Sequence, residues 1–515
     1  MRTRNRLLAV IAGLAVASVA LTGCLFSIIP DASPRPSSSA TPDTAGIAAD
    51  LLPFYGQTVT WSSCGSADEC AKITAPLDWE HPGKGDVKLA LIRHRATNGS
   101  ALGSLLVNPG GPGASGISLV RDSLDFAVGG TLAKEYDVVG FDPRGVGAST
   151  AVTCYDAKQM DAYLFAIPQN PRGSAAWKSE VLASGKKFAD ACQANSDGIL
   201  PYVTTDFAAR DMDLMRAVLG DKKLNYLGYS YGTFLGATYA KLYPTRVGRF
   251  VLDGAIDPSV SGLDVSTTQG VGFESALRAY MASCLKQKDC PFSGTVDDGM
   301  ADLGTLLASV DRTPLRNSDG RRLGADSLVT AIVAALYSQD SWPYLTQALA
   351  ATLKGNAGPA FQLADFYYNR TDGKYEDNSY EAFNAYNCMD YPDDATRAQK
   401  DAANAELKAK APVIAPYWSS DVNICDVWPV KATGVREKIA ADGAGPILVI
   451  GTTNDPATPY SWAVSLADQL SSGVLITRVG EGHTGFNKGN TCVDDAVNQY
   501  FTSGTVPKDG LRCAG

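Results

Sequence analysis

Histidine is scarce in this chain, and the usual metal-binding motifs are missing. Its 515 residues include 3 histidines, His81, His94 and His483, which are scattered along the chain away from its cysteines. Neither Cys-x-x-Cys nor His-Glu-x-x-His occurs, so a zinc site is not expected. No cofactor motif rises above background. The sequence therefore predicts a protein that uses neither a metal nor a cofactor.

Positive charge is also in short supply. The chain has 45 lysines and arginines against 54 aspartates and glutamates, which gives a formal net charge of −9. A surface of that sign offers no electrostatic footprint for a phosphate backbone. Nucleic acid is therefore excluded as an expected partner.

No apolar run reaches roughly 20 residues, the length that a membrane-spanning helix needs. The longest candidate, Leu7 to Ala20, is uncharged and follows three arginines at positions 2, 4 and 6. A basic start followed by a short apolar stretch is typical of a signal peptide. We therefore interpret residues 1–23 as a signal peptide.

The end of that segment indicates how the protein is held after export. Leu21-Thr-Gly-Cys24 resembles a bacterial lipobox, in which the cysteine is lipidated and becomes the new N-terminus. Residues 24–49 are rich in proline and serine and suit a mobile tether. These features predict anchoring through Cys24 to the outer face of the cell membrane. The alternative is a plain secretory signal that is cleaved near Ala20.

Cysteine usage agrees with export. Of 11 cysteines, ten remain once Cys24 is assigned to lipid. Pairing them in sequence order gives Cys64–Cys70, Cys154–Cys192, Cys284–Cys290, Cys388–Cys425 and Cys492–Cys513. Connectivity does not follow from sequence, so only the two short loops, 64–70 and 284–290, go beyond a guess. An oxidising, extracytoplasmic compartment is expected.

The chain's most informative stretch is Gly228-Tyr-Ser-Tyr-Gly232. It lies between an apolar run at 223–227 and a segment rich in alanine, leucine and tyrosine that begins at Thr233. Strand, Gly-x-Ser-x-Gly and helix in that order form a nucleophile elbow, whose sharp turn requires glycines at its flanks. Ser230 is thus the candidate nucleophile, the alternative being an ordinary glycine-rich turn.

Short apolar runs alternate with helical stretches along most of the chain. Strands are expected at 88–95, 104–108, 136–142, 223–227, 249–253, 446–451 and 474–479, after an irregular lead-in over 50–82. This alternation predicts a mostly parallel sheet. Between 258 and 444 the strand signal disappears, and helices are expected at 327–337, 344–353 and 396–411. We call this segment the cap, a mainly helical insertion between core parts 50–257 and 445–515.

A serine nucleophile needs a general base and an acid that orients it. His483 follows the last expected strand in a glycine-rich loop, which makes it the candidate base. In folds that carry the serine on such an elbow, the acid precedes the histidine in the chain. Asp455, which directly follows strand 446–451, is therefore the candidate acid. Asp253 and Asp257 are the rival acids, because they end an earlier strand.

Oxyanion donors are expected from two backbone amides. One is that of Tyr231, the residue after the nucleophile, and the other comes from the loop after an early strand. Pro109-Gly-Gly-Pro-Gly113 is that loop. Gly111 is the chosen donor and Gly110 the near alternative.

Taken together, these motifs and Asn387-Cys-Met-Asp390 resemble the α/β-hydrolase peptidases related to prolyl iminopeptidase. Within these the chain is most similar to the secreted tripeptidyl aminopeptidases of actinobacteria and their mycobacterial lipoprotein relatives. The resemblance implies an α/β-hydrolase fold and release of short peptides or single residues from free N-termini. Asn108 stands where the prolyl iminopeptidase loop has histidine, which weakens the transfer of a proline preference.

An exopeptidase of this kind must bind the substrate's ammonium group, which calls for a carboxylate in a partly desolvated pocket. The cap offers Glu376, Asp377, Asp390, Asp393 and Asp394. Asp390 is favoured because a disulfide at Cys388 would hold it rigidly. Two other functions stay open: an esterase or lipase with the same triad, and a non-catalytic binding lipoprotein.

Overall fold

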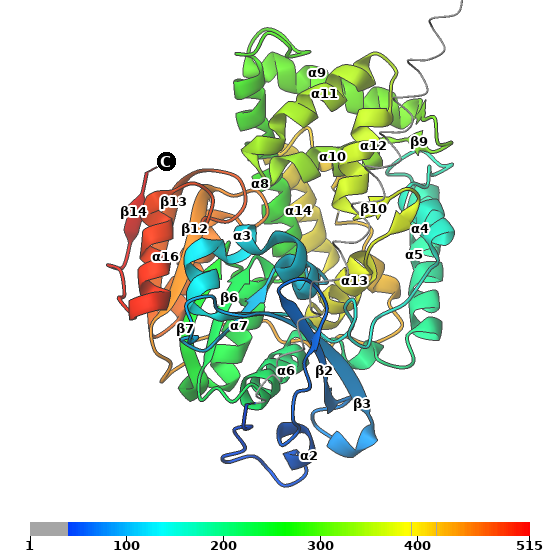
Figure 1. Cartoon of the computed structure of the whole chain (residues 1–515). Coiled ribbons are helices and arrows are strands. Elements are labelled where there is room, and N and C mark those ends of the chain that lie inside the picture. Colours follow the sequence, from blue (N-terminus) through cyan, green and yellow to red (C-terminus); the bar gives the residue numbers. More distant parts are fainter. Residues whose placement is uncertain (1–39, 393, 419, 515) are drawn as a thin grey trace, which may run out of the picture. The chain divides into compact units, whose positions relative to one another are not determined.

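A computed structural model describes residues 40–392, 394–418 and 420–514 (Figure 1). Residues 40–515 form one compact unit. The proposed signal peptide, most of the tether and Cys24 lie outside the described residues. Among the described residues no helix has the length and apolar character needed to cross a bilayer.

A ten-stranded sheet forms the centre of this unit. Its strand order is β1-β2-β3-β5-β4-β6-β7-β12-β13-β14. Pairing is antiparallel from β1 to β5 and parallel from β5 onward. The strands are β1 (Ser62–Ser63), β2 (Asp68–Pro76), β3 (Asp86–His94), β4 (Ser104–Asn108), β5 (Asp137–Asp142), β6 (Leu224–Tyr229), β7 (Val247–Asp253), β12 (Ile447–Asn454), β13 (Gly473–Glu481) and β14 (Leu511–Cys513). The mostly parallel sheet expected from the sequence is confirmed.

Helices cover both faces of the sheet. On one face α3 (Gly116–Glu135) and α16 (Thr491–Ser503) pack onto one set of alternate strand residues. The opposite face packs against α2 (Leu52–Tyr55), α6 (Thr205–Val218), α7 (Tyr231–Leu242) and α15 (Tyr460–Gln469). Because both faces are buried, the central strands are apolar throughout, which explains why β4 to β7 are visible in the sequence.

The cap lies between β7 and β12 and has a hydrophobic core of its own. Its helices are α8 (Gly262–Cys284), α9 (Val296–Arg312), α10 (Ala325–Leu336), α11 (Trp342–Leu353), α12 (Gly358–Tyr367), α13 (Ser379–Asp390) and α14 (Arg397–Lys410). It also contains two hairpins, β8 (Leu315–Arg316) with β9 (Arg322–Leu323), and β10 (Arg370–Thr371) with β11 (Lys374–Tyr375). The expected helices correspond to α10, α11 and α14.

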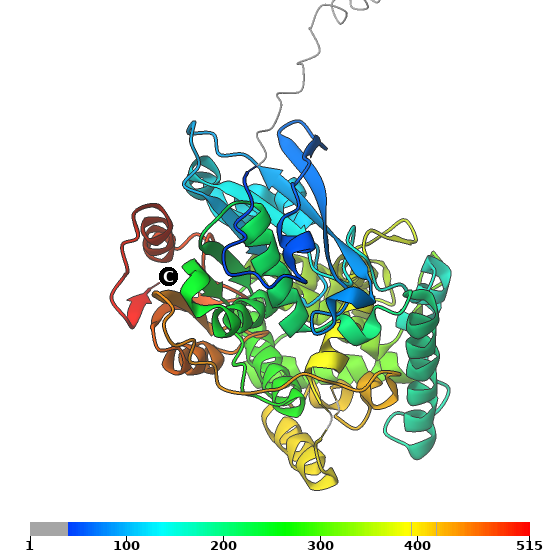
Figure 2. The ribbon, with the colours of Figure 1, turned by 90° about the horizontal axis from the view of Figure 1, so that it is seen from below.

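Helices α4 (Ala157–Leu164) and α5 (Ala175–Asn195) precede β6 in the chain but lie beside the cap. Figures 1 and 2 both show α5 at the opposite end of this unit from α16. An ion pair between Arg370 and Asp161 joins the β10–β11 hairpin to α4. Short 3-10 helices occupy Pro82–Lys84, Leu200–Tyr202, Pro244–Arg246, Gln339–Ser341, Ala415–Tyr417 and Ile424–Val427.

Two sequence expectations about local structure have definite outcomes. All five disulfides formed by pairing the ten cysteines in order are present. The irregular lead-in expected over 50–82 is wrong in part, because residues 68–76 form strand β2, paired with β3 along its whole length. Most of the buried residues of β2 alternate along the strand (Ala71, Ile73 and Ala75), so it lacks the continuous apolar run of the central strands.

Candidate active site

The strand register brings several loops together at one edge of the sheet. Asn108 pairs with Gly228, Tyr229 pairs with Asp253, and Asp253 pairs with Ile450. The carboxyl ends of these parallel strands therefore lie side by side, where open α/β sheets bind their ligands.

Ser230 occupies a sharp turn between β6 and α7. Its backbone has φ 54° and ψ −122°, a region that residues with a Cβ rarely adopt. The flanking glycines have no room for side chains. A Cβ on Gly228 would lie 2.5 Å from the Gly232 carbonyl oxygen, and one on Gly232 would lie 2.8 Å from Asn108 Oδ1. The geometry is that of a nucleophile elbow, with a partly exposed serine at its tip.

Asp455 and His483 meet across the loops that follow β12 and β13. His483 Nδ1 lies 2.9 Å from each carboxylate oxygen of Asp455, whose side chain is fully buried. The same carboxylate accepts hydrogen bonds from the amides of Ala457, Thr458 and Thr484 and from the Thr458 hydroxyl. So many donors fix the carboxylate, and the carboxylate in turn fixes the imidazole.

The cap holds the histidine from the other side. The backbone amide of His483 donates to the carbonyl of Tyr337, at the end of α10, over 2.9 Å. The two rings meet edge to face with centroids 5.3 Å apart. Sequence reasoning did not find Tyr337, because a backbone carbonyl contact leaves no pattern in the sequence.

The rival acids have other partners. Asp253 is fully buried and accepts hydrogen bonds from the amides of Gly485 and Phe486. Burial raises its pKa to about 6. Asp257 accepts hydrogen bonds from Ser259 and Gln469. Within the described residues neither carboxylate bonds to His483, so Asp253 positions the histidine loop through its backbone.

The glycine loop after β4 lies directly on the elbow. A Cβ on Gly110 would stand 2.9 Å from Ser230 Cβ and 3.1 Å from the Tyr231 amide nitrogen. The Gly110 amide already donates to Asn108 Oδ1 over 3.0 Å. In the described part of the chain, the amides of Gly111 and Tyr231 have no acceptor. Gly111 is thus better placed than Gly110 to donate to an oxyanion.

Asp390, which the sequence favours as the amine-binding residue, lies buried where the cap meets α6. It is 4% exposed, and its two oxygens accept hydrogen bonds from the amide and the hydroxyl of Thr205. The same hydroxyl lies 2.5 Å from Tyr231 Oη. Asp390 therefore links the cap to the residue that follows the candidate nucleophile, and it also lines a cavity of about 370 Å³.

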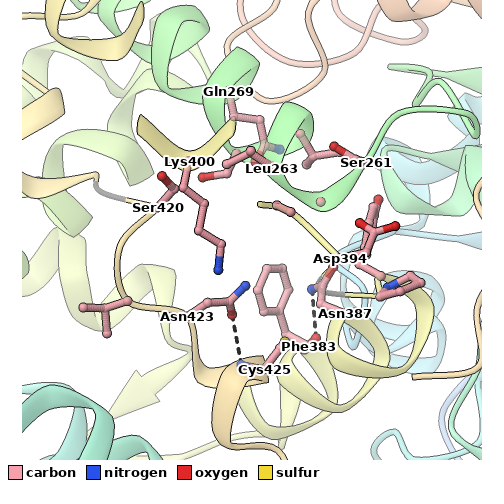
Figure 3. Close-up of a pocket in the computed structure, with 17 residues that line it drawn as sticks. Ser261, Leu263, Gln269, Phe383, Asn387, Asp394, Lys400, Ser420, Asn423 and Cys425 are labelled. Carbon is pink, nitrogen blue, oxygen red and sulfur yellow. Dashed lines mark hydrogen bonds between the residues drawn. The ribbon is translucent and has the colours of Figure 1, made fainter. Parts of the chain in front are cut away.

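Two cavities bear on the site: one lies in the cap, and the other is lined by His483. One, of about 310 Å³, lies among α8, α13, α14 and residues 420–425, and Figure 3 shows Lys400 and Asp394 on opposite sides of it. Two contacts join the walls of this cavity to the loops of the sheet region. The backbone of α13 at Phe383 lies against Gly113, and the Gln269 side chain donates to the Ala457 carbonyl over 2.8 Å. The other cavity, of about 610 Å³, touches His483 and Pro109.

An elbow serine on a mostly parallel sheet, beside a loop-borne Asp–His pair, defines an α/β-hydrolase. Comparison with known proteins agrees. Residues 411–513 match the family model described as TAP-like protein. The chain is 35% identical to serine protease Hip1 of Mycobacterium tuberculosis over 541 residues, covering 99% of this chain and 98% of that protein.

Two further relatives are similar over most of their length. Carboxylesterase B of Mycobacterium tuberculosis is 39% identical over 510 residues, with 96% of each chain covered. Tripeptidyl aminopeptidase of Streptomyces lividans is 30% identical over 472 residues, covering 88% of this chain and 86% of that one. The chain belongs to this family of α/β-hydrolase serine hydrolases, and it is a serine hydrolase.

Proposed function

We propose that the chain is an extracytoplasmic serine exopeptidase that releases short peptides, tripeptides foremost, or single residues from free N-termini. Ser230 is the nucleophile, His483 the general base and Asp455 the acid that orients it. The proposal rests on the pairing of His483 with the buried Asp455 carboxylate, next to an elbow serine. Beside that serine, the amides of Gly111 and Tyr231 have no acceptor in the described chain.

The reaction would follow from these positions. Ser230 Oγ attacks the scissile carbonyl while His483 takes its proton. The amides of Gly111 and Tyr231 then donate to the oxyanion, and each such donor is typically worth about 2.7–4 kcal/mol in the transition state. His483 returns the proton to the leaving amine, which leaves an acyl-enzyme for water to hydrolyse.

A free N-terminus needs a carboxylate near the acyl side of the cleft. Among the described residues lining the cavity in Figure 3, Asp394 is the acidic one. We assign the substrate's ammonium group to Asp394 in place of Asp390. The resemblance to a tripeptidyl aminopeptidase supports release of tripeptides.

Export and anchoring belong to the same proposal. The five disulfides support an oxidising compartment outside the cytoplasm. Cys24 would carry the lipid that holds the enzyme at the outer face of the membrane, with residues 24–49 as the tether. The substrates would then be peptides and protein N-termini present outside the cell, and nucleic acid would not be a partner.

A second candidate is a cell-envelope esterase with the same triad. It is favoured by the 39% identity to a relative named carboxylesterase B. Acetylation of the substrate's N-terminus separates the two functions. An aminopeptidase loses activity on acetylated peptides, because the ammonium group is gone, whereas an esterase prefers uncharged acyl esters.

The test compares Ser230→Ala with Ser309→Ala, a control at an exposed serine of α9. Ser230→Ala is expected to lose labelling by a fluorophosphonate and about 10⁶-fold in kcat on unblocked tripeptidyl anilides. Ser309→Ala should keep both. Mass analysis of a peptide ladder then counts the residues released. Full hydrolysis by Ser230→Ala would overturn the proposal.

A further inference from the structure

We infer that the cavity beside His483 binds the part of the substrate that leaves, and that it recognises a carboxylate there. This inference rests on the proposed function and extends it to the far side of the scissile bond. The residues that line the cavity include Pro109, Tyr337, His483, Phe126, Arg478 and Lys488.

The position of His483 indicates which part of the substrate this cavity binds. The general base must hand its proton to the leaving nitrogen, so the leaving peptide has to pass His483. His483 lines this cavity and is not among the residues that line the cavity in Figure 3. A peptide that spans the elbow would thus place its N-terminal part in one cavity and its C-terminal part in the other.

Charge distinguishes the two cavities in the same sense. Within the described residues neither Arg478 nor Lys488 has a carboxylate within ion-pair distance. Arg478 Nη1 donates to the Glu481 carbonyl over 2.9 Å, and its other nitrogens have no acceptor in the described chain. Lys488 Nζ is buried, has no hydrogen-bond partner there and lies 3.1 Å from the centre of the Phe126 ring.

The acids around the cavity leave these cations available. The Glu481 carboxylate accepts a hydrogen bond from the Asn454 amide, and Asp340 is exposed. Asp253 lies behind the histidine loop, where two backbone amides hold it. Asp494 accepts a hydrogen bond from the amide of Asn487. Burial lowers the pKa of Lys488 to about 8, so it still carries its charge at neutral pH.

The expected ligand is therefore a leaving segment with an apolar body and a carboxylate. Phe126 is 57% exposed, and with Leu119 and Tyr337 it provides an apolar surface. Arg478 would make the direct ion pair, and Lys488 would add positive potential from beneath Phe126. The carboxylate has two possible sources: the C-terminus of a short peptide, or an acidic side chain just after the scissile bond.

The experiment compares matched substrates of the full-length enzyme. Unblocked Ala-Ala-Ala-Phe is tested as the free acid and as the amide, and Ala-Ala-Ala-Asp-amide is tested against its Asn counterpart. In at least one pair, we expect the substrate with the additional carboxylate to have about tenfold higher kcat/KM than its uncharged counterpart. A factor of about ten corresponds to one charge-assisted hydrogen bond in a partly exposed site. The acid/amide pair reports the C-terminus, and the Asp/Asn pair reports the side chain.

The ratio of kcat/KM between the two substrates of a pair measures the preference for the carboxylate. Arg478→Gln should bring this ratio close to one, whereas Arg478→Lys should keep most of it. Arg121→Gln, an exposed arginine of α3 that pairs with Asp122, serves as the control and should keep the ratio. Using a ratio cancels any general loss of activity. In the wild type the preference should also shrink as salt is raised, because the site is open to solvent.

The outcomes are separable. Equal kcat/KM within both substrate pairs of the wild type overturns this inference, and so does a preference that Arg478→Gln retains. Hydrolysis of tripeptidyl anilides alongside either result leaves the proposed function standing. An enzyme that cleaves none of the unblocked peptides overturns the proposed function and the inference together.

Discussion

Two regions hold the candidate active site, and they do so by different means. The loops at the carboxyl edge of the sheet supply the proposed reactive groups, and each group follows its own strand directly. The cap supplies contacts that come from distant points of the chain: the carbonyl of Tyr337 to the His483 amide, and the carboxylate of Asp390 to Thr205. The sheet region therefore carries the proposed reactive groups, and the cap fixes their positions.

The two regions also hold their buried carboxylates differently. The sheet loops give backbone N–H donors to Asp455 and to Asp253. On the cap side, α13 carries Asp390 and Glu381, whose pKa values burial raises to about 6 and about 7. We infer that burying these two carboxylates against the sheet region lowers the stability of the folded protein. The predictions below test each side of this contrast.

Among the tests of this contrast, the largest effect is expected from exchanging the acid in the sheet region. Asp455→Asn should lower kcat by about 10⁴-fold, because an amide cannot hold the required tautomer of His483. Steady-state kinetics on a tripeptidyl anilide measure this.

Asp253→Asn is the matched control, because it makes the same carboxylate-to-amide exchange in the buried rival acid. Asp253 touches the histidine loop only through the Gly485 and Phe486 amides. Its change should cost stability and at most about tenfold in kcat, the scale of one backbone hydrogen bond. If Asp253→Asn instead equals Asp455→Asn in kcat, the assignment of the acid is wrong.

What the sequence predicts follows the same division. Strands β4 to β7 and β12 are buried on both faces, so their apolar runs are continuous and the sequence predicts them. β2 has one mainly buried face, formed by Ala71, Ile73 and Ala75, and exposed Lys72 on the other, so its apolar residues are not continuous. The helices of the cap were recognisable as helices, but no sequence pattern places α4 and α5 beside them.

The candidate site shows the contrast residue by residue. The sequence predicts Ser230, Asp455 and His483 as site residues because each stands next to its strand in a motif with local signals. Asp390 was noticed for its cysteine neighbour, yet its partner Thr205 is 185 residues away in the chain. Long-range pairing of this kind depends on how the cap folds back, and no local spacing encodes it.

A middle-sized effect is expected in the stability of the cap–sheet contact. Burial, together with the charge of Asp377, raises the pKa of Glu381 to about 7 from its usual 4.5. The folded state then binds a proton that the unfolded state has released, so stability falls as pH rises from 4.5 through about 7. Glu381→Gln should thus be more stable than the wild type at pH 8 by roughly 1–3 kcal/mol, and equal to it near pH 4.5.

Urea unfolding at the two pH values measures this difference. Glu376→Gln, which changes an exposed carboxylate of the same segment, is the control and should show little change at either pH. A gain for Glu381→Gln that is the same at pH 4.5 and at pH 8 would contradict a titrating buried carboxylate.

The smallest effect is expected where the cap reaches the oxyanion donor. Thr205→Val removes the hydroxyl that joins Tyr231 Oη to Asp390, and Tyr231→Phe removes only the Tyr231 end of that chain. A slight shift of the Tyr231 amide should lower kcat by about tenfold in Thr205→Val and less in Tyr231→Phe, with KM unchanged. Asp390→Asn should resemble Thr205→Val on unblocked and acetylated substrates alike. A rise in KM confined to unblocked peptides would instead restore Asp390 as the amine-binding residue and place substrate recognition, as well as geometry, in this part of the cap.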